Sequence, residues 1–205
     1  MNELKPQKYK LIVGLGNPDK EHMETRHNVG FDAVDAFGKK YQIELKHDKK
    51  LSSWCGKREL AVNGEVYQVI LAKPDTYMNH SGIAVNKLLN WYKVNVSSLL
   101  IIHDEVALDL GKIRISHGRG PGGHHGVESI IESIGGKQEF TRLRIGVGPD
   151  PGGDIRKDYV LGKFTNKEKE ILSKVINLTI ETIETLLEQN VEFTMNKYNG
   201  VELGA

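Results

Sequence analysis

The sequence predicts an α/β fold in which a mixed, twisted β-sheet is flanked by helices, within a single domain covering residues 1–205. Short apolar runs of strand length alternate along the chain with segments whose apolar residues recur at helical spacing. Two β-rich runs are joined by Asn63-Gly64, the dipeptide typical of a tight antiparallel hairpin, so the sheet should be mixed rather than purely parallel. The 205 residues, 39% of them hydrophobic, are enough to build one core, and no repeat or linker-like stretch divides them.

The first half of the chain contains five of the predicted elements, three strands and two helices, and the hairpin turn. The apolar run YKLIVGLG (9–16) stops at Gly-Asn-Pro, which is typical of a buried strand. Apolar residues then recur at helical spacing from Val29 to Phe37, which favours a first helix. The two strands of the hairpin lie within KRELAVNGEVYQVILA (57–72). Ser81 precedes an apolar-periodic run over 83–92, which predicts a second helix.

In the second half, strands and a helix alternate again. The run LLIIHDE (99–105) should form a buried strand that ends on polar residues, with GKIRIS (111–116) as its neighbour in the sheet. A glycine-rich loop leads into VESIIESI (127–134), a third helix, and RLRIGVG (142–148) is typical of a further strand.

A long amphipathic helix is predicted after these strands. Thr165 and Glu168 have the spacing of a capping box, in which each side chain satisfies a backbone N–H at the start of a helix. Apolar residues follow at helical spacing: Ile171, Leu172, Val175, Leu178, Ile183 and Leu186.

Composition limits the classes of function. The chain has 28 Lys and Arg against 27 Asp and Glu, so its net charge of +1 creates no long-range attraction for polyanions, and any contact with nucleic acid must be local. The only cysteine, Cys55, excludes an intramolecular disulfide and a cysteine-rich zinc site. The N-terminal segment is polar, and the apolar run after it is too short for a signal peptide or a membrane span. We therefore expect a cytoplasmic protein without membrane contact.

Polar residues with useful chemistry gather at the predicted junctions between strands and helices. Ligands of open α/β sheets collect beyond the carboxyl ends of strands, where loops meet helix N-termini. The residues at these junctions are Asn17, His27, Asn79, Asp104, His124 and His125. Each also has a structural explanation: Asn17 as a turn residue, Asn79 and His125 as helix caps, and Asp104 as a capping or salt-bridged carboxylate. Their shared location favours a ligand site.

Several kinds of site lack their motifs. The segment GLGNPD has Asp19 where a dinucleotide-binding loop needs its third glycine, and no phosphate-binding G-x-x-x-x-G-K-[ST] loop occurs. No G-x-S-x-G nucleophile motif is present, and Cys55 lacks the local signature of a catalytic thiol.

A metal site is an alternative, because His103, Asp104, His124 and His125 could meet in space. Their local pattern is not H-E-x-x-H, however, and adjacent side chains in a strand point to opposite faces. We therefore favour water activated by a histidine that a carboxylate orients, without a metal ion. Activity lost on chelation and restored by a transition metal would favour the metal alternative instead.

At these positions the sequence resembles the bacterial-type peptidyl-tRNA hydrolase family. The motifs that carry the resemblance occur in family order and extend over most of the chain: LIVGLGNP (11–18), TRHNVGF (25–31), KPDTYMNHSG (73–82), IIHDE (101–105), GGHHG (122–126), RLRIGVG (142–148) and YVLGKF (159–164). The resemblance implies hydrolysis of the ester that joins a peptide to the 3′ end of tRNA, by a monomeric, single-domain α/β enzyme that needs no metal or other cofactor.

The resemblance also implies roles for individual residues. His27 would be the general base, and Asp104 the carboxylate that supports it. Asn17 would distinguish a blocked, peptide-like amino group from a free one, and Asn79 would hold the substrate and the water. Tyr77 would form an apolar wall beside the substrate.

The expected tRNA contacts are basic side chains. Arg144 matches a basic residue that the family places near a tRNA phosphate. From Gly111 to Gly126 the chain has Lys112, Arg114 and Arg119 and no acidic residue, so a local basic strip is predicted in a nearly neutral protein. Contacts from this strip to phosphates would be salt-sensitive and independent of base identity. The alternative is an edge strand that charged residues protect from pairing.

Three positions depart from the family pattern. His22, which would also face the substrate, stands where the family often has Tyr. Ser116 stands where some members carry a Lys that helps to clamp phosphate, a role that Arg114 or Arg119 would then take. His125 replaces the Asn of the usual G-G-H-N-G, so an imidazole stands where an amide would position the substrate or water. The His125 change leaves one alternative to catalysis: a non-catalytic RNA-binding relative of the same fold, such as the plant organellar splicing factors.

Overall fold

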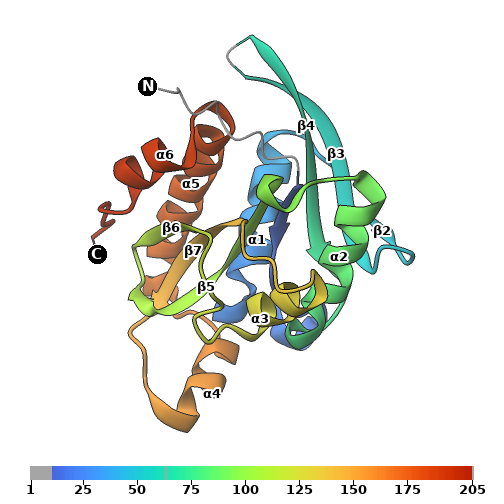
Figure 1. Cartoon of the computed structure of the whole chain (residues 1–205). Coiled ribbons are helices and arrows are strands. Elements are labelled where there is room, and N and C mark those ends of the chain that lie inside the picture. The colour runs from blue at the N-terminus through green and yellow to red at the C-terminus, as the bar shows by residue number, and fades with distance from the viewer. Residues whose placement is uncertain (1–10, 63, 205) are drawn as a thin grey trace.

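The protein is built around one mixed seven-stranded sheet in the computed structural model, which describes residues 11–62 and 64–204 (Figure 1). The strands lie in the order β2-β3-β4-β1-β5-β7-β6. Their bounds are β1 Leu11–Gly14, β2 Lys46–Asp48, β3 Ser53–Val62, β4 Glu65–Pro74, β5 Leu99–Asp109, β6 Ile113–His117 and β7 Thr141–Gly148. The central pairs β4–β1, β1–β5 and β5–β7 are parallel, whereas β2–β3, β3–β4 and β6–β7 are antiparallel. The predicted mixed α/β sheet is confirmed.

Helices cover both faces of this sheet (Figure 1). Their bounds are α1 Val29–Lys40, α2 Ser81–Tyr92, α3 His125–Ser133, α4 Arg156–Leu161, α5 Asn166–Glu188 and α6 Val191–Tyr198, and short 3₁₀ turns include η2 Arg26–Asn28 and η3 Met78–His80. Helices α1, α5 and α6 pack on one face, while α2 and α3 pack on the other. None of the helices described is both long and apolar enough to cross a bilayer.

Alternation of side chains along the central strands divides the core into two layers. In β1, Ile12 joins the cluster under α1 and α5, whereas Leu11 and Val13 join the cluster under α2 and α3. The neighbouring β5 alternates in the same way, with Leu100 on the first side and Leu99 on the second. Successive side chains of a strand point to opposite faces of the sheet. Because helices cover both faces, every position in the apolar runs of these strands is buried, which explains why the runs are uninterrupted.

Two glycines bring α1 close to the end of β1. A Cβ on Gly14 would lie 2.0 Å from the backbone oxygen of Gly30, and a Cβ on Gly30 would lie 2.4 Å from the oxygen of Ile102. Only glycine allows such an approach of backbones. As a result η2, which immediately precedes α1, is held against the carboxyl end of β1 and beside β5.

Most of the predicted elements are confirmed, including the hairpin and the capping box at Thr165 and Glu168. Asn63 of the hairpin turn lies outside the described residues. The short elements β2, α4 and α6 were not predicted. The three-residue β2 and the six-residue α4 are too short for a periodic pattern, and α6 buries only Thr194 and Tyr198 in its eight residues.

The predicted pairing of 111–116 with 99–105 is wrong. Strand β6 pairs with β7, which lies between β6 and β5. The burial of the two strands gives the reason, because seven of the eight residues of β7 are buried, which suits an internal strand, whereas Arg114 of β6 is exposed, which suits the edge.

One side chain covers the outer side of β6. The amide of Asn199 accepts a hydrogen bond from the Ile115 N–H at 2.7 Å and donates one to the Ile115 carbonyl at 3.1 Å. It thereby occupies both backbone groups that a further strand would use at this residue.

Candidate active site

The polar residues predicted at strand ends line a single cleft of about 780 Å³ beyond the ends of β1 and β4 and beside β5. Those of the predicted residues that line it are Asn17, His22, His27, Tyr77, Asn79, Asp104, His124 and His125. The structure therefore brings together segments that are up to 108 positions apart in the chain, from Asn17 to His125.

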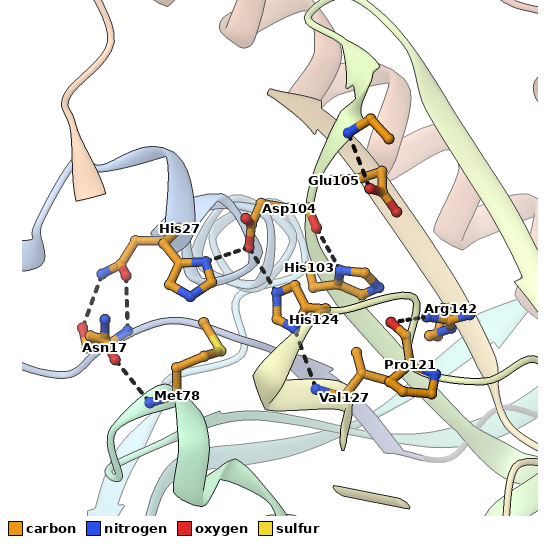
Figure 2. A network of polar contacts seen from close by, with 12 residues as sticks. Asn17, His27, Met78, His103, Asp104, Glu105, Pro121, His124, Val127 and Arg142 are labelled. Atoms are coloured by element: carbon orange, nitrogen blue, oxygen red, sulfur yellow. Dashed lines mark hydrogen bonds and ion pairs between the residues drawn. The ribbon is translucent and has the colours of Figure 1, made fainter. Parts of the chain in front are cut away.

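The imidazole of His27 is joined to the carboxylate of Asp104 at the bottom of the cleft (Figure 2). The distance from His27 Nδ1 to Asp104 Oδ1 is 2.8 Å, and the side chains are 14% and 3% exposed. The ionised carboxylate can only accept a hydrogen bond, so His27 Nδ1 carries the proton and donates a hydrogen bond to Asp104 Oδ1. The other ring nitrogen, Nε2, is left with a lone pair for a proton from the cleft.

A second histidine donates to the same carboxylate oxygen. His124 Nε2 lies 3.0 Å from Asp104 Oδ1, and His124 Nδ1 accepts the N–H of Val127 at 3.3 Å (Figure 2). Acceptance at Nδ1 fixes the neutral tautomer with its proton on Nε2. His124, and not His125, is therefore the residue whose side chain caps α3.

His103 packs against His124 and Asp104 on the side away from the cleft. Its ring centroid lies 4.3 Å from that of His124, and its Nδ1 donates to the carbonyl oxygen of Asp104 at 2.6 Å. Burial, and then the neighbouring His124, hold the pKa of His103 well below its usual range, so the ring is neutral. His103 is thus a structural part of the network and does not face the cleft.

The pKa values of the catalytic candidates follow from their surroundings. Burial opposes protonation of His27, but the charge and hydrogen bond of Asp104 outweigh it, and the net effect raises the pKa of His27. Burial alone would raise the pKa of Asp104, yet His27 and His124 hold that pKa well below its usual range. The carboxylate is therefore ionised and the imidazole titrates above its ordinary pKa.

The residues that could hold a metal ion differ from the set expected. The ligand atoms of His27, Asp104 and His124 lie within 4.8 Å of one another, whereas His103 and His125 do not join this group. His103 is turned behind the site, and His125 lies on its exposed rim. Both histidines of the group already have a proton between their nitrogen and Asp104 Oδ1, and a metal ion would have to displace both protons.

Asn17 is held in one orientation by its neighbours (Figure 2). Its Oδ1 accepts the N–H of Met78 at 2.9 Å, while its own backbone N–H donates to Asn28 Oδ1 at 2.9 Å and its carbonyl accepts from Asn28 Nδ2 at 3.0 Å. Because the side-chain oxygen is engaged, the NH₂ group of Asn17 is the part left for a ligand. Asn17 is therefore fixed as a hydrogen-bond donor to the cleft, and it is no simple turn residue.

Comparison with known proteins agrees with these motifs. The sequence profile of the peptidyl-tRNA hydrolase family matches residues 11–204. The chain belongs to this family. It is 39% identical to the peptidyl-tRNA hydrolase of Clostridium perfringens over 193 residues, which are 94% of this chain and 98% of that protein. It is 41% identical to that of Syntrophomonas wolfei over 190 residues, 93% of this chain and all of that protein.

A solved structure of the family has the same fold. Peptidyl-tRNA hydrolase from Acinetobacter baumannii superimposes with a TM-score of 0.88 at 36% identity, over 96% of this chain and 97% of that one. The α/β architecture of this chain is thus the architecture of the peptidyl-tRNA hydrolase family.

The remaining predicted substrate residues lie on the rim of the cleft. Tyr77 is 59% exposed and Asn79 is also exposed, so both are free to contact a ligand. His22 is tied to Asp19 through a 2.6 Å contact between Nδ1 and Oδ1. The side chain of His125, the departure from the family pattern, is 71% exposed, and Glu128 lies 3.4 Å from its Nδ1.

The arginines predicted to contact tRNA phosphates lie outside the cleft, on or beside the two strands at the sheet edge. Arg114 of β6 and Arg144 of β7 are directly opposite each other in the ladder. Arg144 donates to Glu105 at 3.1 Å, whereas Arg114 and Arg119 are exposed. Like charges directly opposite each other are destabilising unless an anion lies between them. Strand β6, which carries Arg114, lies at the edge of the sheet, which agrees with the alternative of a charged edge strand; the contact of these arginines with phosphates stays a prediction.

Sequence reasoning missed one side of the cleft. Helix α4 contributes Arg156, Lys157, Val160 and Leu161 to the lining. The motif YVLGKF overlaps the end of α4, but only the resemblance drew attention to it. The adjacent basic pair before that motif is the signal that could have indicated a contact with an anionic ligand.

Proposed function

We propose that His27 activates water for the hydrolysis of peptidyl-tRNA, the reaction that membership in the family gives to this chain. The observation that carries this role is the 2.8 Å hydrogen bond from His27 Nδ1 to Asp104 Oδ1 within the cleft. It fixes the tautomer in which Nε2 is unprotonated, as a general base requires. The hydrolysed bond is the ester between the last residue of the peptide and the 3′-terminal ribose of tRNA.

In the proposed reaction, His27 Nε2 removes a proton from water as the water oxygen attacks the ester carbonyl. The tetrahedral intermediate collapses when the bond from the carbonyl carbon to the ribose oxygen breaks, and the proton on Nε2 passes to that oxygen. The products are a free peptide carboxylate and a tRNA with its hydroxyl restored. Asp104 stabilises the imidazolium that exists between the two proton transfers.

We assign the recognition of the peptide to the donor of Asn17. Its Nδ2 can donate to the carbonyl oxygen of an acylated amino group, whereas a free α-ammonium group carries only donors and would meet a donor. Such a mismatch rejects the unblocked substrate because both groups would lose their solvation without a partner. Asn79 would hold the ester and the attacking water, and Tyr77 would pack against the peptide or the terminal base.

We propose that tRNA phosphates are bound around the cleft by Arg144, Arg114 and Arg119 on one side and by Arg156 and Lys157 of α4 on the other. Arg156 is also paired with Asp150 at 2.6 Å, which leaves Lys157 as the less restrained charge of α4. Such contacts neutralise phosphates without reading the sequence, which suits a substrate class with many tRNAs. His22 and His125 would complete the rim.

We further propose that the chain is one domain that acts as a cytoplasmic monomer and needs no metal ion. Two alternatives have one supporting observation each. The imidazole at His125 favours a relative that binds RNA without turnover, and the ligand group of His27, Asp104 and His124 favours a metal-dependent hydrolase.

The deciding experiment uses N-acetyl-aminoacyl-tRNA and the matching free aminoacyl-tRNA with the purified protein. We expect cleavage of the blocked form only, no loss of activity after chelation and extensive dialysis, and a decrease of about 10²- to 10⁴-fold in kcat for His27→Ala. Binding without cleavage would support the RNA-binding alternative. Full activity of His27→Ala would refute the proposed base, and rescue of a chelated protein by a transition metal would support the metal alternative.

A further inference from the structure

The residue that precedes the proposed base has an unusual environment for a charged side chain. Arg26 is only 8% exposed, although its neighbour His27 faces the cleft. Its guanidinium lies over the ring of Tyr159, 4.4 Å from the centroid, and 5.0 Å from that of Phe164. Both rings belong to the segment that begins with α4 and leads into α5.

Polar contacts fix the same guanidinium. Arg26 donates from Nη1 to the carbonyl of Lys163 at 2.9 Å and from Nη2 to Glu168 Oε1 at 2.7 Å. Buried arginines are strongly oriented when a planar fork is satisfied on one edge and stacked on its faces. Lysine cannot reproduce this arrangement.

The backbone joins the two segments at the same place. The Arg26 N–H donates to the carbonyl of Gly162 at 3.0 Å, and Thr25 forms an antiparallel bridge with Lys163. On one side of this bridge, His27 follows directly after Arg26. On the other side, the bridge follows the end of α4, whose residues Val160 and Leu161 line the cleft. The base and the α4 side of the cleft therefore share one point of attachment.

Glu168 links this attachment to the start of α5. One carboxylate oxygen accepts from Arg26, while the other accepts the Thr165 N–H at 2.7 Å as part of the capping box. Burial alone would raise the pKa of Glu168, but the Thr165 cap and Arg26 lower it, so the carboxylate is ionised. The first turn of α5 thus orients the Arg26 side chain.

We propose that Arg26 is a positioning residue for the hydrolysis. Its contacts with Glu168 and with the rings of Tyr159 and Phe164 set the orientation of the His27 segment and hold α4 against the cleft. Arg26 does not touch the substrate. This inference rests on the proposed role of His27, because a residue that positions the base matters only if the base acts.

A close contact provides an independent perturbation. A Cβ added at Gly162 would lie 3.3 Å from Arg26 Nη1 and 3.1 Å from the carbonyl oxygen of Tyr159. Gly162→Ala should therefore displace the guanidinium by a few tenths of an ångström while leaving every charge in place. We expect it to reproduce, more weakly, the effect of changing Arg26 itself.

The test compares kcat and KM for Arg26→Lys, Arg26→Met, Glu168→Gln and Gly162→Ala, at a temperature well below the Tm of each variant. Misplacement of a reacting group by about 1 Å can cost about 10²-fold. We expect kcat to fall about 10- to 100-fold in Arg26→Met and less in Arg26→Lys, with a rise in KM as α4 loosens. Glu168→Gln should lower kcat a few-fold although Gln can still serve in a capping box.

Two controls separate positioning from stability. Thr165→Ala removes the side-chain cap but leaves both partners of the ion pair, so it should lower Tm without changing kcat. Lys40→Met breaks an ion pair with Glu184 at the other end of α5 and should leave kcat and KM unchanged. Hydrogen exchange should become faster in α4 in the Arg26 variants, and to a smaller extent in Glu168→Gln and Gly162→Ala, but not in these two controls.

Wild-type kcat and KM in Arg26→Lys and Gly162→Ala, with only Tm lowered in Arg26→Met, would overturn the proposal. A Thr165→Ala variant that loses as much kcat as Arg26→Lys would also overturn it. Activity of the wild type together with an inactive His27→Ala shows that the proposed function holds, so failure of this inference is distinguishable from failure of that one.

Discussion

The two sides of the cleft are built differently. The cleft floor, which we define as Asn17, His27, Asp104 and His124, is held by hydrogen bonds to groups on β5, η2, η3 and α3. The cleft wall, which we define as the four lining residues of α4, belongs to a six-residue helix with one buried residue, at the outer edge of the molecule in Figure 1.

The fold separates the groups that we propose for the chemistry from those that we propose for binding. Each group of the floor has its orientation determined by a second protein group, so the proton transfer that we propose would occur between atoms that are already in place. In the wall, Lys157 has a long, flexible side chain on a short helix, so it can reach the phosphate that we propose it binds from more than one direction. Changes in the floor should therefore act on kcat, and changes in the wall on KM and salt dependence.

The largest effect should follow from Asp104→Asn. The amide keeps the shape of the carboxylate but can donate to His27 Nδ1, which allows the tautomer with the proton on Nε2 and no base facing the cleft. We expect kcat to fall about 10²- to 10⁴-fold. A decrease of less than tenfold would show that the floor does not depend on this pair.

The pH profile of the same variant gives a second measurement. The folded-state pKa of His27 is raised above its ordinary value by Asp104, and the base is active only when neutral. The acid limb of kcat/KM should therefore lie above the ordinary histidine pKa in the wild type. In Asp104→Asn the acid limb of the remaining activity should move to lower pH. Burial lowers the pKa of His27, and the variant has no carboxylate at position 104 to oppose that effect. An unchanged limb would assign the titration to another group.

A smaller effect of another kind is expected in the wall for Lys157→Ala. KM should rise a few-fold with little change in kcat. The slope of log KM against log salt concentration should decrease by about 1, the value expected for the loss of one phosphate contact. Lys167→Ala on the exposed start of α5, outside the cleft lining, is the matched control. Equal changes in both variants would point to general charge attraction and not to a contact made by the wall.

The smallest effect is expected for His125→Asn, which restores the usual residue of the family pattern. The His125 side chain is 71% exposed, and its 3.4 Å approach to Glu128 is too long for a strong hydrogen bond. Because nothing in the floor depends on it, kcat should change by less than about threefold, within the range of surface substitutions. A rise of more than tenfold would show that the imidazole impairs substrate positioning and that the rim belongs functionally with the floor.

Sequence reasoning found the floor residues because each lies at the end of an apolar run or just before a predicted helix, although β5 continues beyond Asp104 to Asp109. Asn17 stops an apolar run, Asp104 ends another, and His124 follows the glycine-rich loop. It did not find that His27 and His124 donate to the same oxygen, because that contact joins three segments separated by 20 to 77 positions. Local spacing carries no information on which side chains converge at such distances.

Helix α4, which forms the cleft wall, was not predicted for another physical reason. The segment RKDYVL lies between glycines at 153 and 162 and buries only Val160, so it has no apolar face with which to predict a helix. Its position depends on Arg26, whose partners Lys163 and Glu168 are 137 and 142 positions away. The order of β5, β7 and β6 was missed for the same reason, since pairing of strands is decided by burial in the whole sheet and not by their sequence order.

The pairing of Asn199 with Ile115 has a consequence for association between molecules. A seven-stranded sheet with an open edge could accept an eighth strand from another copy, and β6 is the strand at that edge. A single amide replaces the missing neighbour by filling both backbone positions of Ile115. Asn199 thus acts as a one-residue strand that continues the edge pairing begun by the bridge between Lys112 and Glu202, and Asn199→Ala would leave both backbone groups of Ile115 without this partner.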